Sequence, residues 1–291
     1  MPSRACRLNI AGVPAPPKDP LTLVNDSGFP FQMRVAAEVD SSPPSHLLWR
    51  LAAEEHAWSA AGGDGGFIDI IATGEGGHRL VIECKRAAEE TWAFLTSVDG
   101  KQVDHVRALC TARREGQEDH LSLWVDLWAS LPSWEAAFCV VKGKGGNVPM
   151  LERIAATLVQ SADALAEEEL QIGRGRPGVR IYIPIIVTAA KLCVSRFDRR
   201  AARLEDGRLS DEAAKFEEVP LVRFKKAFAS KHDSTVATLE EAQMAGQQTV
   251  IVVNATALRW FLAEWFTKSP DDALRQAIRR GVRQAENDGT T

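Results

Sequence analysis

Three charged residues near the ends of two apolar segments have types and spacing that suit metal chemistry. Asp69 lies in the first apolar segment, and Glu83 and Lys85 lie at the end of the second, after a glycine-rich stretch. If residues 79–85 form a strand, alternate side chains share a face, so Glu83 and Lys85 project together while Cys84 points away. A tight turn between the two segments then brings Asp69 close to both.

Two carboxylates that converge in this way form a site for a hard cation. The oxygens of Asp69 and Glu83, with the backbone carbonyl of Cys84, suit Mg²⁺, and Mn²⁺ is a plausible substitute. A cation there would polarise a phosphate ester and lower the pKa of a bound water. Lys85 could orient that water or stabilise the charge that develops on the phosphate. The alternative is a sheet-edge ion-pair cluster, because so short a match also arises by chance.

The elements that must position these residues are predicted from hydrophobic periodicity. The first are a helix at Phe31–Val39 and three strands at Leu48–Trp58, Gly66–Thr73 and Arg79–Lys85. Gly74, Gly76 and Gly77 favour a tight turn before the third strand. The alanines and glutamates of the first strand would also suit a helix, and that alternative stays open.

The remaining chain yields further predicted elements. Helices are predicted at Ala87–Ser97, Val103–Ala112, Val148–Leu170 and Ala257–Phe266, and strands at Ala136–Val141, Val179–Ala189, Lys191–Phe197 and Thr249–Asn254. Lys191–Phe197 is expected to pair with the strand before it as a hairpin.

This order predicts a mixed α/β fold with a central mixed β-sheet flanked by helices and with a C-terminal elaboration. Residues 1–28, rich in proline and polar residues, are expected to form a mobile arm. Residues 29–268 are expected to form the main domain, and residues 269–291 a basic helix and disordered tail.

Composition indicates a soluble, cytoplasmic protein. With 291 residues and 45% hydrophobic content, the chain can bury a full core, and no apolar stretch is long enough for a membrane helix. The start lacks the pattern of a secretory signal. Five scattered cysteines without a CxxC pair argue against disulfides and a zinc site.

Charge gives mixed indications about partners. A net charge of −4 does not favour a nucleic-acid binder. Basic clusters nevertheless occur towards the carboxyl end, at Arg196–Arg203, Arg223–Lys226 and Arg275–Arg283. Each would equally suit a solvated surface. The loop Lys142–Asn147 could offer amides and lysines to a phosphate, but a plain tight connection is the better interpretation.

The spacing of these residues resembles the PD-(D/E)XK, or restriction-endonuclease-like, nuclease superfamily. Asp69 matches the metal-binding aspartate of that family, and Glu83-Cys84-Lys85 matches its (D/E)XK tripeptide. The proline of the family name is absent, since Ile68 precedes Asp69. The predicted order of helix, three strands, helix and strand is similar to the family core.

The resemblance implies further site residues. Many members carry a metal-binding glutamate on the first helix, and Glu38 is the position here that matches best. Glu54 and Glu55 are rivals for this role. The resemblance thus implies a catalytic set of Asp69, Glu83, Lys85 and Glu38 around Mg²⁺.

The activity that the resemblance implies is metal-dependent hydrolysis of phosphodiester bonds in nucleic acid, with DNA favoured over RNA. It further suggests a role in bacterial restriction or anti-phage (antiviral) defence. A homodimer and a protein partner are left open. Two alternatives remain, namely a catalytically silent nucleic-acid-binding subunit of a larger complex and a phosphohydrolase acting on nucleotides.

Overall fold

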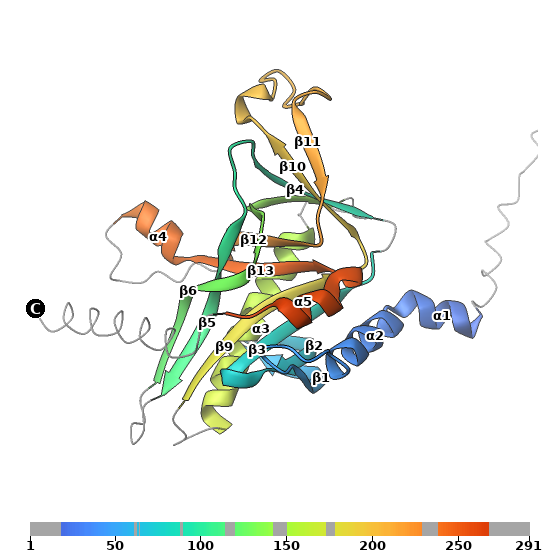
Figure 1. The fold of residues 1–291 in the computed structure, drawn as a ribbon, viewed down its shortest axis with the longest axis vertical. Coiled ribbons are helices and arrows are strands. Elements are labelled where there is room, and N and C mark those ends of the chain that lie inside the picture. Colours follow the sequence, from blue (N-terminus) through green and yellow to red (C-terminus); the bar gives the residue numbers. More distant parts are fainter. Residues whose placement is uncertain are drawn as a thin grey trace, which may run out of the picture.

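The computed structural model describes residues 19–60, 63, 65–87, 90–113, 120–141, 150–172, 178–228 and 238–267 (Figure 1). Its helices are α1 (Pro20–Ser27), α2 (Phe29–Asp40), α3 (Met150–Ile172), α4 (Leu239–Ala245) and α5 (Leu258–Glu264), with short 3-10 turns at Glu75–Gly77, Arg199–Ala201 and Ala255–Ala257. Within these ranges, no helix combines the length and the apolar character needed to cross a membrane.

Most strands belong to one central mixed sheet. They are β1 (Arg50–Ser59), β2 (Gly65–Thr73), β3 (His78–Lys85), β5 (Val103–Arg113), β6 (His120–Ser133), β7 (Glu135–Ala136), β9 (Gly178–Thr188), β12 (Leu221–Ala227) and β13 (Gln247–Asn254). β1, β2 and β3 are antiparallel neighbours, and β9 and then β13 continue the sheet parallel to β3. The predicted central mixed sheet is therefore present.

Helices α2 and α5 cover one face of this sheet. Val35 and Val39 of α2 and Phe261 of α5 are buried in the same cluster as Ile70 and Ile82 of the sheet. The buried positions of α2 recur three and four residues apart, which is the spacing of one helical face. This periodicity is why the sequence predicted the helix.

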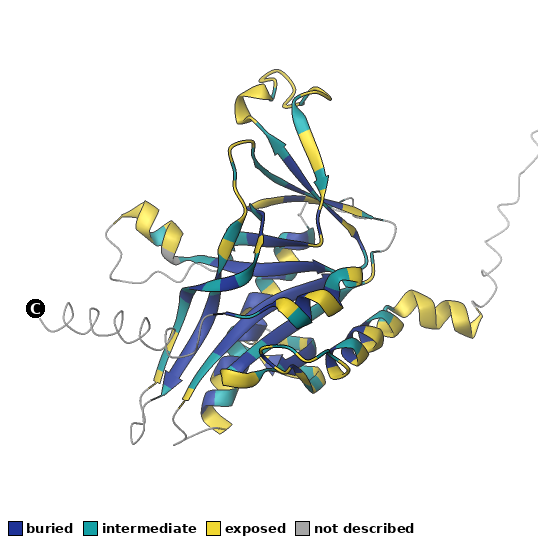
Figure 2. Cartoon of the chain, viewed as in Figure 1, coloured by how far each residue is buried: buried dark blue, intermediate teal, exposed yellow. Residues whose placement is uncertain are grey.

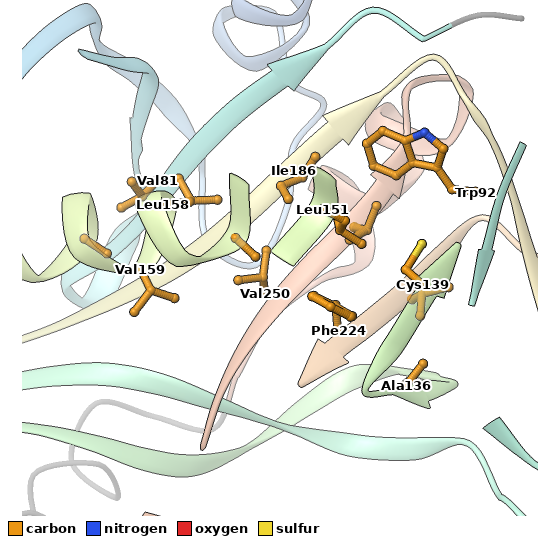
Figure 3. Packing of buried hydrophobic residues seen from close by; sticks show 14 of the residues in the cluster. Val81, Trp92, Ala136, Cys139, Leu151, Leu158, Val159, Ile186, Phe224 and Val250 are labelled. Atoms are coloured by element: carbon orange, nitrogen blue, oxygen red, sulfur yellow. The ribbon is translucent and has the colours of Figure 1, made fainter. Parts of the chain in front are cut away.

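Helix α3 covers the opposite face. Figure 3 shows its residues Leu151, Leu158 and Val159 beside Val81 and Ile186 of the sheet. The strands between the two helical layers are buried along most of their length (Figure 2). The sheet is thus the shared wall of two apolar cores.

A second sheet extends from the first. Its order is β11 (Ala214–Glu218), β10 (Lys191–Phe197), β4 (Thr91–Ser97) and β8 (Phe138–Val141). β10 is parallel to β4, so the prediction that it forms a hairpin with β9 is wrong. The reason is that β3 and β9 are already parallel, and their continuations β4 and β10 remain neighbours after leaving the central sheet.

Two segments that were predicted to be helices form strands instead. Residues 91–97 form β4 and residues 103–113 form β5, where the sequence predicted helices at Ala87–Ser97 and Val103–Ala112. Trp92 and Phe94 are buried at alternate positions of β4, which is the period of a strand. In β5 five consecutive residues, from Ala108 to Ala112, are buried, so no alternation marks the strand.

The amino-terminal region also differs from the prediction. Pro20–Ser27, within the predicted mobile arm, forms α1, which begins at an Asp19 cap and ends at Gly28. Residues 1–18 and 268–291, including the basic cluster Arg275–Arg283, lie outside the described residues, as does the loop Lys142–Asn147.

The turn between β2 and β3 requires glycine at one position. Gly77 has φ +84°, and a Cβ there would lie 2.1 Å from the carbonyl oxygen of Val179 on β9. No side chain fits this approach. The turn thereby sets the register in which β2 and β3 pair. This register also determines which residues of the two strands lie opposite each other past the last pair, Ile70 and Ile82.

Candidate metal centre

Asp69 lies where the main-chain pairing of β2 and β3 stops. The last paired residues are Ile70 and Ile82, so Asp69 comes level with Glu83 on the next strand. The Asp69 side chain takes the place of the next main-chain bond, because its Oδ2 accepts the N–H of Cys84 at 2.7 Å. The predicted approach of Asp69 to the Glu83–Lys85 segment is confirmed at this position.

Glu83 and Lys85 also meet. The Nζ of Lys85 is 2.5 Å from Oε1 of Glu83, and both side chains keep part of their surface in solvent, 35% for Lys85 and 21% for Glu83. A surface ion pair of this kind contributes about 0–1 kcal/mol to stability. Because both side chains are partly exposed, a ligand can approach this ion pair from solvent.

The carboxyl of Asp69 is strongly perturbed. Its pKa is raised to about 6, first by burial and then by the negative charge of Glu83, although the Cys84 N–H and Lys85 act to lower it. Glu55 also raises this pKa. The acids therefore outweigh the nearby positive charge, which is the electrostatic condition under which a cation would bind.

Glu55 comes from β1. Its neighbours Glu54 and His56 pair with Ile70 and Ile68 of β2, so Glu55 is at the register position of Asp69. Three acids from three adjacent strands, Glu55, Asp69 and Glu83, thus occupy one level of the sheet. Glu55 was a rival in the sequence prediction, and the structure brings it to the site.

Glu38 lies elsewhere. Its carboxylate forms ion pairs with Arg34 on α2 and with Arg259 on α5, the latter at 3.8 Å. It is not among the groups that shift the pKa of Asp69. The structure therefore does not bring Glu38 together with the other predicted site residues.

Gln32 of α2 reaches the site and was missed by the sequence prediction. Its amide nitrogen donates to the carboxylate of Glu55 and to the main-chain carbonyl of Asp69, the latter at 3.3 Å. The available signal was its position on the apolar stripe of the helix, since Gln32 precedes the buried residues Val35, Ala36 and Val39 by three, four and seven residues.

The donor set fits a hard divalent cation. Asp69 and Glu83 supply carboxylate oxygens, and the Cys84 carbonyl is directed to the same side as its N–H, towards Asp69. Among the described residues no three His, Cys, Asp or Glu side chains form a preformed cage. Mg²⁺ does not need one, because it commonly binds one or two carboxylates and keeps several waters.

The basic cluster Arg223–Lys226 does not form an exposed basic surface. Arg223 is fully buried on β12, where it donates to the carbonyl of Leu131 at 2.7 Å, and burial lowers its pKa to about 10. Lys225 pairs with Glu135. On the β10–β11 hairpin, by contrast, Arg199 and Arg200 are exposed.

Comparison with known proteins gives no relative. No family model matches the chain, and neither a curated protein nor a solved structure is similar to it.

Proposed function

We propose that this protein is a metal-dependent nuclease that hydrolyses phosphodiester bonds, with DNA as the favoured substrate. The observation that carries the proposal is the convergence of Asp69, Glu83 and Lys85 where β2 and β3 stop pairing, with Glu83 and Lys85 partly exposed and the pKa of Asp69 raised to about 6. The order α2, β1, β2, β3, α3 and β9, with β4 to β8 inserted between β3 and α3, also supports the proposed resemblance to a restriction-endonuclease-like core.

Asp69 and Glu83 would hold Mg²⁺, with the Cys84 carbonyl as a third oxygen ligand and Glu55 close by. When bound, the ion supplies Lewis-acid polarisation of the phosphate and a more acidic water. This assignment keeps Asp69 and Glu83 from the predicted set and replaces Glu38 with Glu55.

Lys85 acts on the substrate side of the site. Its ammonium lies against Glu83 and is about one-third exposed, so it can donate hydrogen bonds both to Glu83 and to an incoming phosphate. In the transition state negative charge builds on the phosphoryl oxygens, and a fixed ammonium there lowers the barrier. Lys85 thereby stabilises the transition state and orients the attacking water.

Cleavage assays test the proposal. The full chain is incubated with supercoiled plasmid, single-stranded DNA and RNA, in Mg²⁺, in Mn²⁺ and in chelator. We expect metal-dependent cleavage by the wild type and a loss of at least about 100-fold in Asp69→Ala and Lys85→Ala. Lys191→Ala is the matched control, because Lys191 is an exposed lysine that pairs with Glu218 on the other sheet.

Equal cleavage by the wild type and both site variants would refute the catalytic assignment. Metal-independent binding of nucleic acid with no cleavage would favour a silent binding subunit. Release of inorganic phosphate from nucleoside triphosphates without strand cleavage would favour a nucleotide phosphohydrolase.

A further inference from the structure

Gln32 is a polar residue in an apolar helix face. It is only 8% exposed, and the other buried residues of α2 are Val35, Ala36 and Val39. A buried amide is costly unless its hydrogen bonds are made. What Gln32 bonds to therefore indicates why a glutamine stands at this position.

Its two amide hydrogens can serve two different strands. The Nε2 of Gln32 donates to Oε1 of Glu55 on β1 and to the main-chain oxygen of Asp69 on β2. One side chain thus connects α2 to the two strands that carry two of the site acids. Both bonds are made at the level of the metal centre.

Glu55 needs such support because its backbone is strained. Its φ is +49°, in the left-handed region that residues other than glycine seldom adopt. Strained residues persist where surrounding contacts hold them, and they concentrate at functional sites. The Gln32 amide donates a hydrogen bond to the Glu55 carboxylate and so holds this side chain.

An amide suits this position electrostatically. It donates to the Glu55 carboxylate without adding charge, so the negative potential at Asp69 is preserved. A lysine or arginine in place of Gln32 would neutralise Glu55 and compete with a bound cation. A glutamate there would repel the Glu55 carboxylate.

We propose that Gln32 is a positioning residue that holds the Glu55 carboxylate beside Asp69 and thereby strengthens divalent-metal binding. The inference rests on the proposed function, since it assumes that Asp69 and Glu83 bind the metal. It adds that α2 takes part in the site through a neutral donor, and that Glu55 is the acid through which this donor acts.

The test is direct Mn²⁺ binding, measured by calorimetry on the full chain without nucleic acid. Gln32→Met keeps the volume of the side chain and removes both hydrogen bonds, and we expect it to weaken Mn²⁺ binding about tenfold. Glu55→Ala should weaken binding by at least as much. The double variant should bind like Glu55→Ala alone, because Gln32 acts through Glu55.

A buried glutamine distant from the site provides the matched control. Gln248 on β13 is 5% exposed and accepts the N–H of Phe228. Gln248→Met should lower thermal stability to a similar degree and leave Mn²⁺ affinity unchanged. If Gln32→Met does not fold, Gln32→Asn keeps the amide but is one methylene shorter, and it should also weaken binding.

The outcomes separate the two proposals. Wild-type Mn²⁺ binding that Gln32→Met leaves unchanged would overturn the role of Gln32 alone. Additive losses in the double variant would also overturn it, because they would show an effect independent of Glu55. A wild type that binds no Mn²⁺, or an Asp69→Ala variant that binds it normally, would overturn the metal centre itself.

Discussion

Asp69 serves at once as part of the sheet and as part of the site. Its carboxylate accepts the Cys84 N–H where main-chain pairing ends, and its pKa is raised to about 6 by burial and by the charge of Glu83. At the proposed metal site, a proton and a divalent cation would therefore compete for the same oxygens near pH 6. Metal binding and metal-dependent cleavage should both weaken below about pH 6.

The raised pKa also predicts a pH dependence of stability. The folded state binds the Asp69 proton more tightly than the unfolded state, whose pKa is near 3.8. The stabilisation by this proton is complete below pH 3.8 and is lost as the pH rises through about 6. After allowance for partial exposure, we expect a loss of about 1–3 kcal/mol.

Urea unfolding of the wild type and Asp69→Asn in chelator, at pH 4 and pH 7.5, measures this difference. The variant lacks the titrating group, so the wild type should lose more stability than Asp69→Asn over this interval. A constant difference between the two proteins would contradict the raised pKa. Mg²⁺ at pH 7.5 should restore stability to the wild type only.

The predictable part of the site is the part that local sequence encodes. Glu83 and Lys85 follow from strand alternation, and Asp69 follows from one turn of known length. Glu38 was chosen over Glu55 because the family resemblance places an acid on the first helix. The hydrogen bond from Gln32 to Glu55 joins residues 23 apart in the chain, and spacing alone reveals neither this bond nor the positive φ of Glu55.

Among the elements, the turn at Gly77 joins the two strands that carry Asp69 and Glu83. Gly77→Ala adds a Cβ in contact with the Val179 carbonyl at a positive φ. We expect a loss of at least about 2 kcal/mol in the free energy of unfolding and a fall in metal affinity, since the β2–β3 register would shift.

Gly207→Ala is the matched control for this variant. Gly207 also has a positive φ, of +69°, but a Cβ there would meet nothing within 4 Å. It should cost only about 1 kcal/mol, with metal affinity unchanged. Equal losses of stability in the two variants would show that the contact with Val179 does not matter.

The amphipathic helices were predicted well, whereas two strands, β4 and β5, were predicted as helices. α2 and α3 each have a regular apolar stripe, and both were predicted within about two residues. β5 is buried on both sides over Ala108–Ala112, so its alanines suggested a helix. The pairing of β10 with β4 could not be predicted, because it follows from which strands are neighbours in the folded sheet.

At the scale of the molecule, the central sheet joins two cores. Ile82 of β3 belongs to the core under α2 and α5, and Val81 of the same strand belongs to the core under α3. Neither core can lose its packing without affecting strands that the other shares. The central sheet and its helices should therefore unfold as one cooperative unit.

Leu158→Ala tests this unity. Leu158 is 3% exposed in the centre of α3, so its truncation should leave a cavity and cost about 2–5 kcal/mol. Tryptophan fluorescence and far-ultraviolet circular dichroism should still give coincident unfolding midpoints. Leu204→Ala, at a fully exposed leucine, should change nothing. Separate midpoints for the two signals in Leu158→Ala would mean that the cores unfold independently.

The strands β3 and β9 leave the central sheet together and reappear side by side as β4 and β10 in the second sheet. Glu83 and Lys85 therefore lie on the strand that pairs with β9, and β9 leads directly into the β10–β11 hairpin at the far end of the second sheet. A force applied to that hairpin would reach the acid and the ammonium group through β9 and its hydrogen bonds to β3. If the proposed nuclease contacts its substrate at this hairpin, that contact would act on the strand next to the proposed catalytic groups.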